Sequence, residues 1–412
     1  MTKTEEYALK MNSLSIYKGI LNRSVPREFL HLLESSHSKP AEFLSAWGNF
    51  FALLCEKGCQ DKLCTYITKA ALYDENSFSK AAAGGKLGDL PESIISAARR
   101  DISIIVEASL ISPQQIISDY KYEDEIKPIL DTLPLWQTGQ PLSQMADINS
   151  AVASSAEFYL QNGCGMFARY KAFIWRDGSI HPVLHPDSVT LDDLKGYSYA
   201  RNLVINNTRA FLNGQSANNC LLYGDKGTGK SSTVKAILNE YCTQGLRIVE
   251  MPKERLCDFP LLIDKIAMVP MKFILYIDDL SFQTQDDSYA SLKAVLEGGL
   301  AARPENTLIY ATSNRRHIVK ENFSDREGGE LHRNDQIQES LSLADRFGLS
   351  VNFSSPSKQD YLDIVAAIAQ QRGVDMDQSE LFKKAESWAL DRGGRSARCA
   401  RQFIDSLFVN KS

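Results

Sequence analysis

The stretch LLYGDKGTGKSS, residues 221–232, joins an apolar run, a glycine-rich turn and the start of a helical pattern. Its glycines and the Lys-Ser pair fit the spacing G-x-x-x-x-G-K-[ST]. Such a turn points backbone N–H groups inward as an anion cradle, and the helix that follows adds its positive end. The stretch therefore predicts a phosphate-binding loop made of Gly224, Asp225, Lys226, Gly227, Thr228, Gly229, Lys230, Ser231 and Ser232.

Two roles within this loop follow from side-chain chemistry. Lys230 is expected to reach the β- and γ-phosphates, and the Ser231 hydroxyl is expected to bind magnesium. A second strand, KFILYIDDL, is apolar from Phe273 to Ile277 and ends in two acids. Asp278 is predicted to hold magnesium, largely through water, because this ion keeps its hydration shell. Asp279 is predicted to polarise the attacking water, the alternative being that both acids mark a solvated strand end.

A third strand, beginning near Thr307, ends in Thr-Ser-Asn. The Asn314 amide there is predicted to hydrogen-bond the γ-phosphate or the lytic water, although these residues are also ordinary in turns. Arg346 follows a helix-like segment, 340–344, and precedes another strand. We expect it to reach a phosphate bound by a neighbouring subunit; a salt bridge to Asp345 or another carboxylate is the alternative.

The C-terminal helix begins just after two glycines, in RGGRSARCARQFID. Arg395 stands at its entrance and is predicted to fold back onto the γ-phosphate, with Arg398 as its substitute. The two arginines, three residues apart, also suit a basic solvated face.

Hydrophobic periodicity divides the chain into four parts. The first is mostly helical, and the second contains a β-hairpin signal at Asp177-Gly178. Strands then alternate with helices, as in a parallel α/β sheet, and the end is helical again. The predicted parts are a helical domain over residues 1–150, a hairpin-containing connector over 151–187, a nucleotide-binding α/β domain over 188–355, and a helical lid over 356–412.

Composition narrows the function classes. The 412 residues carry a formal net charge of −5, so no overall basic field indicates nucleic-acid binding, although single-strand binding by the core stays open. The first residues lack the apolar core of a secretion signal, and the most apolar run is too short to span a bilayer. We therefore expect a cytoplasmic protein with no membrane association, whose eight cysteines are reduced core thiols. A metal cluster of Cys55, Cys59 and Cys64 is disfavoured by their spacing.

The five elements, in this order, resemble the AAA+ superfamily: Walker A, Walker B, sensor 1 at Asn314, arginine finger at Arg346, and sensor 2 at Arg395 or Arg398. Residues 165–412 more closely resemble a bacterial family of predicted AAA+ ATPases, catalogued as domain of unknown function 815. The resemblance implies a P-loop AAA+ core with a parallel sheet flanked by helices, a small helical lid, and binding of ATP or ADP with Mg²⁺. It also assigns the segment VTLDDLKGY to the adenine, with Leu194, Gly196 and Tyr197 as candidates.

One departure from most AAA+ motors is Asp279, which stands where they carry a longer glutamate. Because geometry governs a general base before its pKa does, we expect slow hydrolysis. The leading hypothesis is an ATP-dependent switch or remodeller that forms a homo-oligomer through Arg346 and binds a macromolecular client through residues 1–150. The alternatives are an initiator- or helicase-loader-like ATPase that acts with nucleic acid, and a nucleotide-sensing interaction protein with little turnover.

Overall fold

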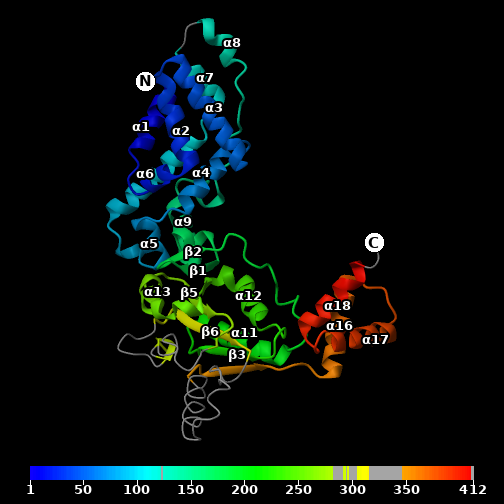
Figure 1. The fold of residues 1–412 in the computed structure, drawn as a ribbon. Coiled ribbons are helices and arrows are strands. Elements are labelled where there is room, and N and C mark those ends of the chain that lie inside the picture. Colours follow the sequence, from blue (N-terminus) through cyan, green and yellow to red (C-terminus); the bar gives the residue numbers. More distant parts are fainter. Residues whose placement is uncertain (122–123, 282–290, 294, 297–303, 315–345, 410–412) are drawn as a thin grey trace. The chain divides into compact units, whose positions relative to one another are not determined.

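The computed structural model describes residues 1–121, 124–281, 291–293, 295–296, 304–314 and 346–409 (Figure 1). The chain divides into two compact units, Met1–Arg169 and Tyr170–Ser412. This division falls inside the segment 151–187 that the sequence predicted as a separate connector. The helical first part of that segment belongs to the first unit, and its β-hairpin belongs to the sheet of the second.

The first unit is helical, as predicted for the start of the chain. Its helices have clear start signals: Pro40 and Pro113 occupy first-turn positions, and the Asn76 side chain accepts a hydrogen bond from the Ser79 N–H. The helices are α1 (Lys3–Asn12), α2 (Ser24–Glu34), α3 (Pro40–Lys57), α4 (Leu63–Leu72), α5 (Ser77–Ala83), α6 (Glu92–Ser109), α7 (Pro113–Asp119), α8 (Lys127–Leu130), α9 (Ala151–Asn162) and α10 (Gly165–Arg169).

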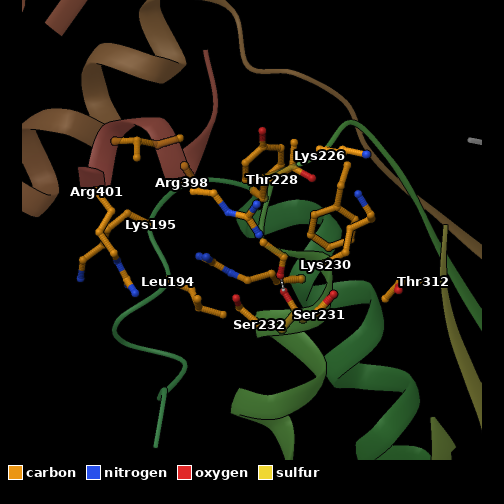
Figure 2. A pocket seen from close by; sticks show the side chains of 18 of the residues that line it. Leu194, Lys195, Lys226, Thr228, Lys230, Ser231, Ser232, Thr312, Arg398 and Arg401 are labelled. Atoms are coloured by element: carbon orange, nitrogen blue, oxygen red, sulfur yellow. Dashed lines mark hydrogen bonds between the residues drawn. The ribbon is translucent and has the colours of Figure 1, made fainter. Parts of the chain in front are cut away.

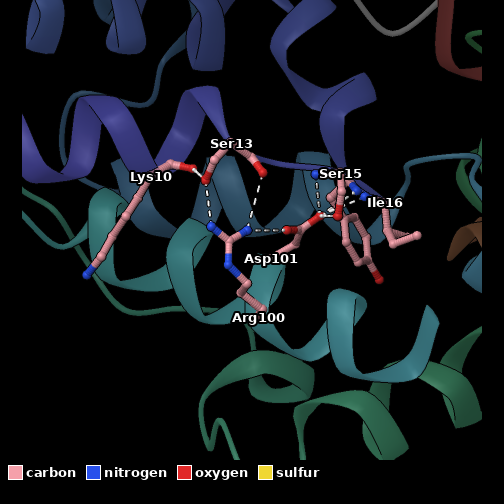
Figure 3. Close-up of polar contacts among 7 residues, drawn as sticks. Lys10, Ser13, Ser15, Ile16, Arg100 and Asp101 are labelled. Carbon is pink, nitrogen blue, oxygen red and sulfur yellow. Dashed lines mark hydrogen bonds and ion pairs between the residues drawn. The ribbon is translucent and has the colours of Figure 1, made fainter. Parts of the chain in front are cut away.

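A buried carboxylate fastens the turn after α1 to helix α6 (Figure 3). Asp101 is fully buried, and its Oδ2 accepts hydrogen bonds from the N–H groups of Ser15 and Ile16, both at 2.8 Å. The neighbouring Arg100 donates to the carbonyl and hydroxyl oxygens of Ser13 at 3.2 and 2.6 Å. These bonds satisfy backbone groups that no helix pairs, which explains a charged residue in this core.

The second unit is built on a seven-stranded sheet in the order β2-β1-β4-β5-β6-β3-β7. Every neighbouring pair is parallel except the β1–β2 hairpin, which turns at Asp177-Gly178 as the sequence predicted. The strands are β1 (Ala172–Arg176), β2 (Ser179–Pro182), β3 (Cys220–Gly224), β4 (Leu246–Glu250), β5 (Lys272–Ile277), β6 (Thr307–Ser313) and β7 (Leu349–Phe353).

Helices cover this sheet and form a lid after it (Figure 1). The helices of the core include α11 (Ser198–Leu212), α12 (Lys230–Tyr241) and α13 (Phe259–Ile266). Three more, α16 (Lys358–Arg372), α17 (Gln378–Asp391) and α18 (Ala397–Val409), pack on one another around Tyr361, Val365 and Phe403. The predicted α/β core with a parallel sheet and a C-terminal helical lid is thus confirmed. Among the described residues, no helix is both long and apolar enough to cross a bilayer.

Candidate nucleotide-binding site

The glycine-rich loop connects the carboxyl end of a buried strand to a helix. Strand β3 is fully buried from Cys220 to Leu222 and ends at Gly224, and α12 begins at Lys230. Gly224 has a φ of 136°, and a Cβ there would lie 2.2 Å from the carbonyl oxygen of Phe353 at the end of β7. Only glycine fits such a conformation and such a close approach, so the contact with β7 fixes where the loop begins.

Lys230 holds the loop from within. Its Nζ donates to the carbonyl oxygens of Gly224 at 2.8 Å and Asp225 at 2.7 Å, and the side chain is only 6% exposed. Burial lowers the pKa of this ammonium group, and nearby carboxylates, that of Asp225 foremost, oppose the shift. A phosphate in the loop would offer the ammonium charged oxygens in place of neutral carbonyls, which makes stronger hydrogen bonds.

Asp278 receives three hydroxyl groups on a single oxygen. Its Oδ1 accepts hydrogen bonds from Ser231 Oγ at 2.8 Å, Tyr276 Oη at 2.6 Å and Thr312 Oγ1 at 2.5 Å. Burial raises the pKa of this carboxyl, but these hydrogen bonds outweigh it and the pKa is lowered. The Ser231 hydroxyl and the ionised carboxylate are hard oxygen donors side by side, a set that fits Mg²⁺ completed by water and phosphate oxygens.

Asp279 stands at the start of the next turn in an uncommon backbone conformation. Its φ is 52°, which few residues other than glycine adopt. Its N–H donates to Thr312 Oγ1 at 3.0 Å, and its Oδ1 accepts a hydrogen bond from Asn314 Nδ2 at 2.5 Å. The second acid of β5 and the amide of β6 are therefore in direct contact.

A cavity of about 470 Å³ lies beside the loop (Figure 2), a size typical of small-molecule sites. Of the residues predicted from the sequence, those that line it are Lys226, Gly227, Thr228, Gly229, Lys230, Ser231, Ser232, Asp278, Asp279, Asn314, Leu194, Tyr197 and Arg398. Gly224, Asp225, Gly196, Arg346 and Arg395 are not among its lining residues.

Part of the cavity wall is apolar. Leu194 and Tyr197, from the segment assigned to adenine, line the cavity together with Phe353, Ile364 and Ile368. The Tyr197 hydroxyl donates to the carbonyl oxygen of Ser354 at 3.0 Å, which ties this segment to the end of β7. The cavity thus combines an apolar wall with a phosphate-type loop, as a nucleotide requires.

The arginines of the lid differ from the prediction. Arg395, the first choice for sensor 2, forms a bidentate ion pair with Glu386 at 3.0 and 3.1 Å. Arg398, named only as its substitute, lines the cavity, and its backbone N–H donates to the carbonyl oxygen of Gly227 at 3.0 Å. Arg398 lies in the first turn of α18, beside the loop, whereas Arg395 lies in the turn before this helix. That Arg398 contacts phosphate stays a prediction.

Several residues at the site were not predicted from the sequence, among them three charged side chains of the lining and one tyrosine. Arg201, Asp193 and Arg401 line the cavity, and Tyr276 contacts Asp278 as described above. The Asp193 carbonyl accepts a hydrogen bond from Arg401 at 3.2 Å, which links the adenine segment to the lid. Arg401 was within reach of sequence reasoning, because it lies three residues after Arg398 and hence on the same helix face.

Arg346 lies three residues before β7, outside the cavity lining. The helix predicted over 340–344 and the alternative partner Asp345 lie outside the described residues.

The second unit has a phosphate-type loop between β3 and α12 and two acids just after β5. Strand β6 lies between β5 and β3 in the sheet, and a helical lid follows β7. This arrangement is that of a P-loop protein with an AAA+ core. The chain belongs to the family described as "Protein of unknown function (DUF815)", which matches residues 168–411. Both the fold class and the family resemblance expected from the sequence are thus confirmed.

Solved structures that are similar to part of the chain include the following two. The Holliday junction branch migration motor RuvB of Thermotoga maritima is 12% identical, over 53% of this chain and 72% of that chain, with a TM-score of 0.33. The AMPPCP-bound DnaA from Aquifex aeolicus is 15% identical, over 53% of this chain and 64% of that chain, with a TM-score of 0.37. These scores are too low to bear on function. No curated protein matches the chain.

Proposed function

We propose that the protein is a Mg²⁺-dependent ATPase that uses nucleotide binding and slow hydrolysis to switch a macromolecular partner. One observation carries the proposal: Ser231 and Asp278 are joined at 2.8 Å in a cavity that also contains Lys230. This juxtaposition provides a hydroxyl, a carboxylate and an ammonium group, which are the groups that a metal-bound triphosphate needs.

In the proposed complex the triphosphate lies along the loop 224–232. The loop N–H groups and the start of α12 hold the phosphate oxygens, and Lys230 turns its ammonium toward the β- and γ-phosphates. Leu194 and Tyr197 pack on the base. Arg398, from the lid, binds the γ-phosphate, so that the lid responds to whether this phosphate is present.

Hydrolysis is assigned to Asp279, which follows β5, and to Asn314, which follows β6 and contacts it. Ser231 and Asp278 would hold Mg²⁺, which would supply neutralisation of phosphate charge. Asp279 accepts a proton from the attacking water, and Asn314 orients the Asp279 carboxylate through the hydrogen bond between them. An aspartate reaches less far than a glutamate, so the water sits less favourably and turnover is slow, which suits a switch better than a processive motor.

The partner assignments rest on the resemblance. We propose that copies of the chain assemble so that Arg346 reaches the nucleotide of a neighbour, and that the helical first unit binds the client in the cytoplasm. An arginine supplied in this way stabilises charge that develops in the transition state. The alternative is a nucleic-acid client. Capture experiments with Asp279→Asn, which should bind ATP without hydrolysing it, would recover nucleic acid in that case.

Two substitutions test the assignment. Lys230→Ala should abolish ATP binding in calorimetry, because it removes the buried ammonium group of the loop 224–232. Lys235→Ala, on the same helix but in an exposed ion pair with Asp187 at 3.5 Å, is the matched control and should bind normally. Unchanged binding by Lys230→Ala would refute the site.

The second substitution separates chemistry from binding. Asp279→Asn should bind ATP with wild-type affinity but release phosphate about 10² to 10⁴ times more slowly, the usual cost of losing a general base. Phosphate release at the wild-type rate would place the base elsewhere. If Asp279→Glu is faster than wild type, the account of a short carboxylate is supported.

A further inference from the structure

A buried tyrosine contacts the acid that is assigned to magnesium. Tyr276 lies on β5 two residues before Asp278, and side chains two apart on a strand point to the same face of the sheet. Its hydroxyl donates to Asp278 Oδ1 at 2.6 Å, and only 3% of the side chain is exposed. The phenol thus reaches the end of its own strand from inside the core.

We propose that Tyr276 is a positioning residue that holds the Asp278 carboxylate for magnesium. The inference deepens the proposed function and rests on it. Oδ1 takes three hydroxyl hydrogen bonds, which occupies its acceptor capacity and fixes the carboxylate plane. The carboxylate then presents its other oxygen, Oδ2, to the water shell of the metal.

The three hydroxyls are not equivalent in this role. Ser231 is itself the proposed magnesium ligand, so its orientation changes with the metal. The Thr312 hydroxyl lies on β6 and also accepts a hydrogen bond from the Asp279 N–H at 3.0 Å, so it is shared between the two acids. Tyr276 belongs to the buried strand β5 and has only two side-chain torsions. Its hydroxyl therefore keeps one position, from which it orients the Asp278 carboxylate.

A structural role is the competing explanation, because buried tyrosine hydroxyls generally have a partner. The chain supplies a matched control for it. Tyr310 is the register partner of Tyr276 on β6 and is also buried. Its hydroxyl makes hydrogen bonds with Thr208 at 2.8 Å and Asn207 at 3.0 Å, both on α11. Removing either hydroxyl perturbs the core similarly, but only the Tyr276 hydroxyl contacts Asp278.

The experiment measures binding and not turnover. Calorimetry gives the dissociation constant of β,γ-methylene-ATP with excess Mg²⁺ and with a chelator, for wild type, Tyr276→Phe and Tyr310→Phe. The ratio of the two constants is the enhancement by Mg²⁺. Loss of a residue that supports a metal ligand typically weakens the metal about 10- to 100-fold. In Tyr276→Phe the enhancement should therefore fall about tenfold, while the dissociation constant measured with chelator stays within about twofold of the wild-type value. In Tyr310→Phe the enhancement should equal that of the wild type.

Each possible result either supports or overturns the positioning role of Tyr276. A wild-type enhancement in Tyr276→Phe overturns the proposal, and so does an equal loss in Tyr310→Phe. If Tyr276→Phe does not fold while Tyr310→Phe does, as judged by thermal denaturation, the hydroxyl is structural and the proposal is overturned as well. In an Asp278→Asn background, adding Tyr276→Phe should change the enhancement no further. Failure of the wild type to bind the analogue at all would instead refute the proposed function.

Discussion

The two lid arginines give a sharp test, because they carry the same charge three residues apart and differ in what they contact. Arg398 lines the cavity, and its backbone bonds to Gly227 of the loop, whereas Arg395 is held by Glu386. A hydrogen bond to a charged group contributes about 1.5–3 kcal/mol. At about 1.4 kcal/mol per factor of ten, Arg398→Ala should weaken ATP binding by about 10- to 150-fold.

The same substitution at the neighbouring arginine should behave differently. Arg395→Ala removes a partly exposed ion pair with Glu386 that lies outside the cavity lining, so its ATP affinity should stay within about twofold of wild type. The assay is calorimetric titration of both variants with ATP and ADP. Arg398→Ala should affect ATP more than ADP, since the γ-phosphate is the assigned contact. The reasoning is refuted if Arg395→Ala weakens ATP binding as much as Arg398→Ala does.

Two other predictions concern the lid and the assembly. Gly196→Ala should lower stability by about 1–3 kcal/mol in thermal denaturation and weaken nucleotide binding, because a Cβ would lie 2.5 Å from Ile364 Cδ1 in the lid core. Gly214→Ala, at a similar positive φ but with open space around it, is the control for backbone strain alone. Arg346→Ala should bind ATP but hydrolyse it poorly, and mixing it with Lys230→Ala protein should restore part of the activity. A mixture of co-assembled chains no more active than its components would contradict an arginine supplied in trans.

Elements whose signal is local could be predicted from the sequence. The apolar runs of β3 and β5 are strands with their polar groups at the carboxyl ends, and the hairpin turns at Asp177-Gly178 with φ values of 51° and 69°. The boundary between the units could not be read in this way. Helix α9, which is rich in alanine and serine, packs its Tyr159 in the core of the first unit. Which core receives such a helix depends on partners distant in the sequence.

At the candidate site, too, residues that are contiguous in the sequence could be predicted, whereas contacts between distant segments could not. The loop and the two acids are fixed by contiguous residues, and they line one cavity. The choice between Arg395 and Arg398 depends on where the first turn of α18 begins, and element boundaries are poorly determined by pattern alone. The contact of Tyr276 with Asp278 has only a weak signal in the sequence, because an aromatic residue in a buried strand is ordinary, although residues two apart along a strand share one face.

Thr312, at the end of β6, holds the turn that carries the two acids after β5. Thr312 Oγ1 accepts from the Asp279 N–H and donates to Asp278 Oδ1, and the Thr312 carbonyl accepts from the Leu280 N–H at 2.7 Å. The unusual φ of Asp279 is thereby held in place by the neighbouring strand, as strained residues at functional sites require. Thr312 therefore contacts the carboxylate of Asp278 and the backbone of Asp279 at the same time. Under the proposed function, a displacement of the end of β6 would alter metal binding by Asp278 and water activation by Asp279 together, which would suit the control of a nucleotide switch better than that of a fast motor.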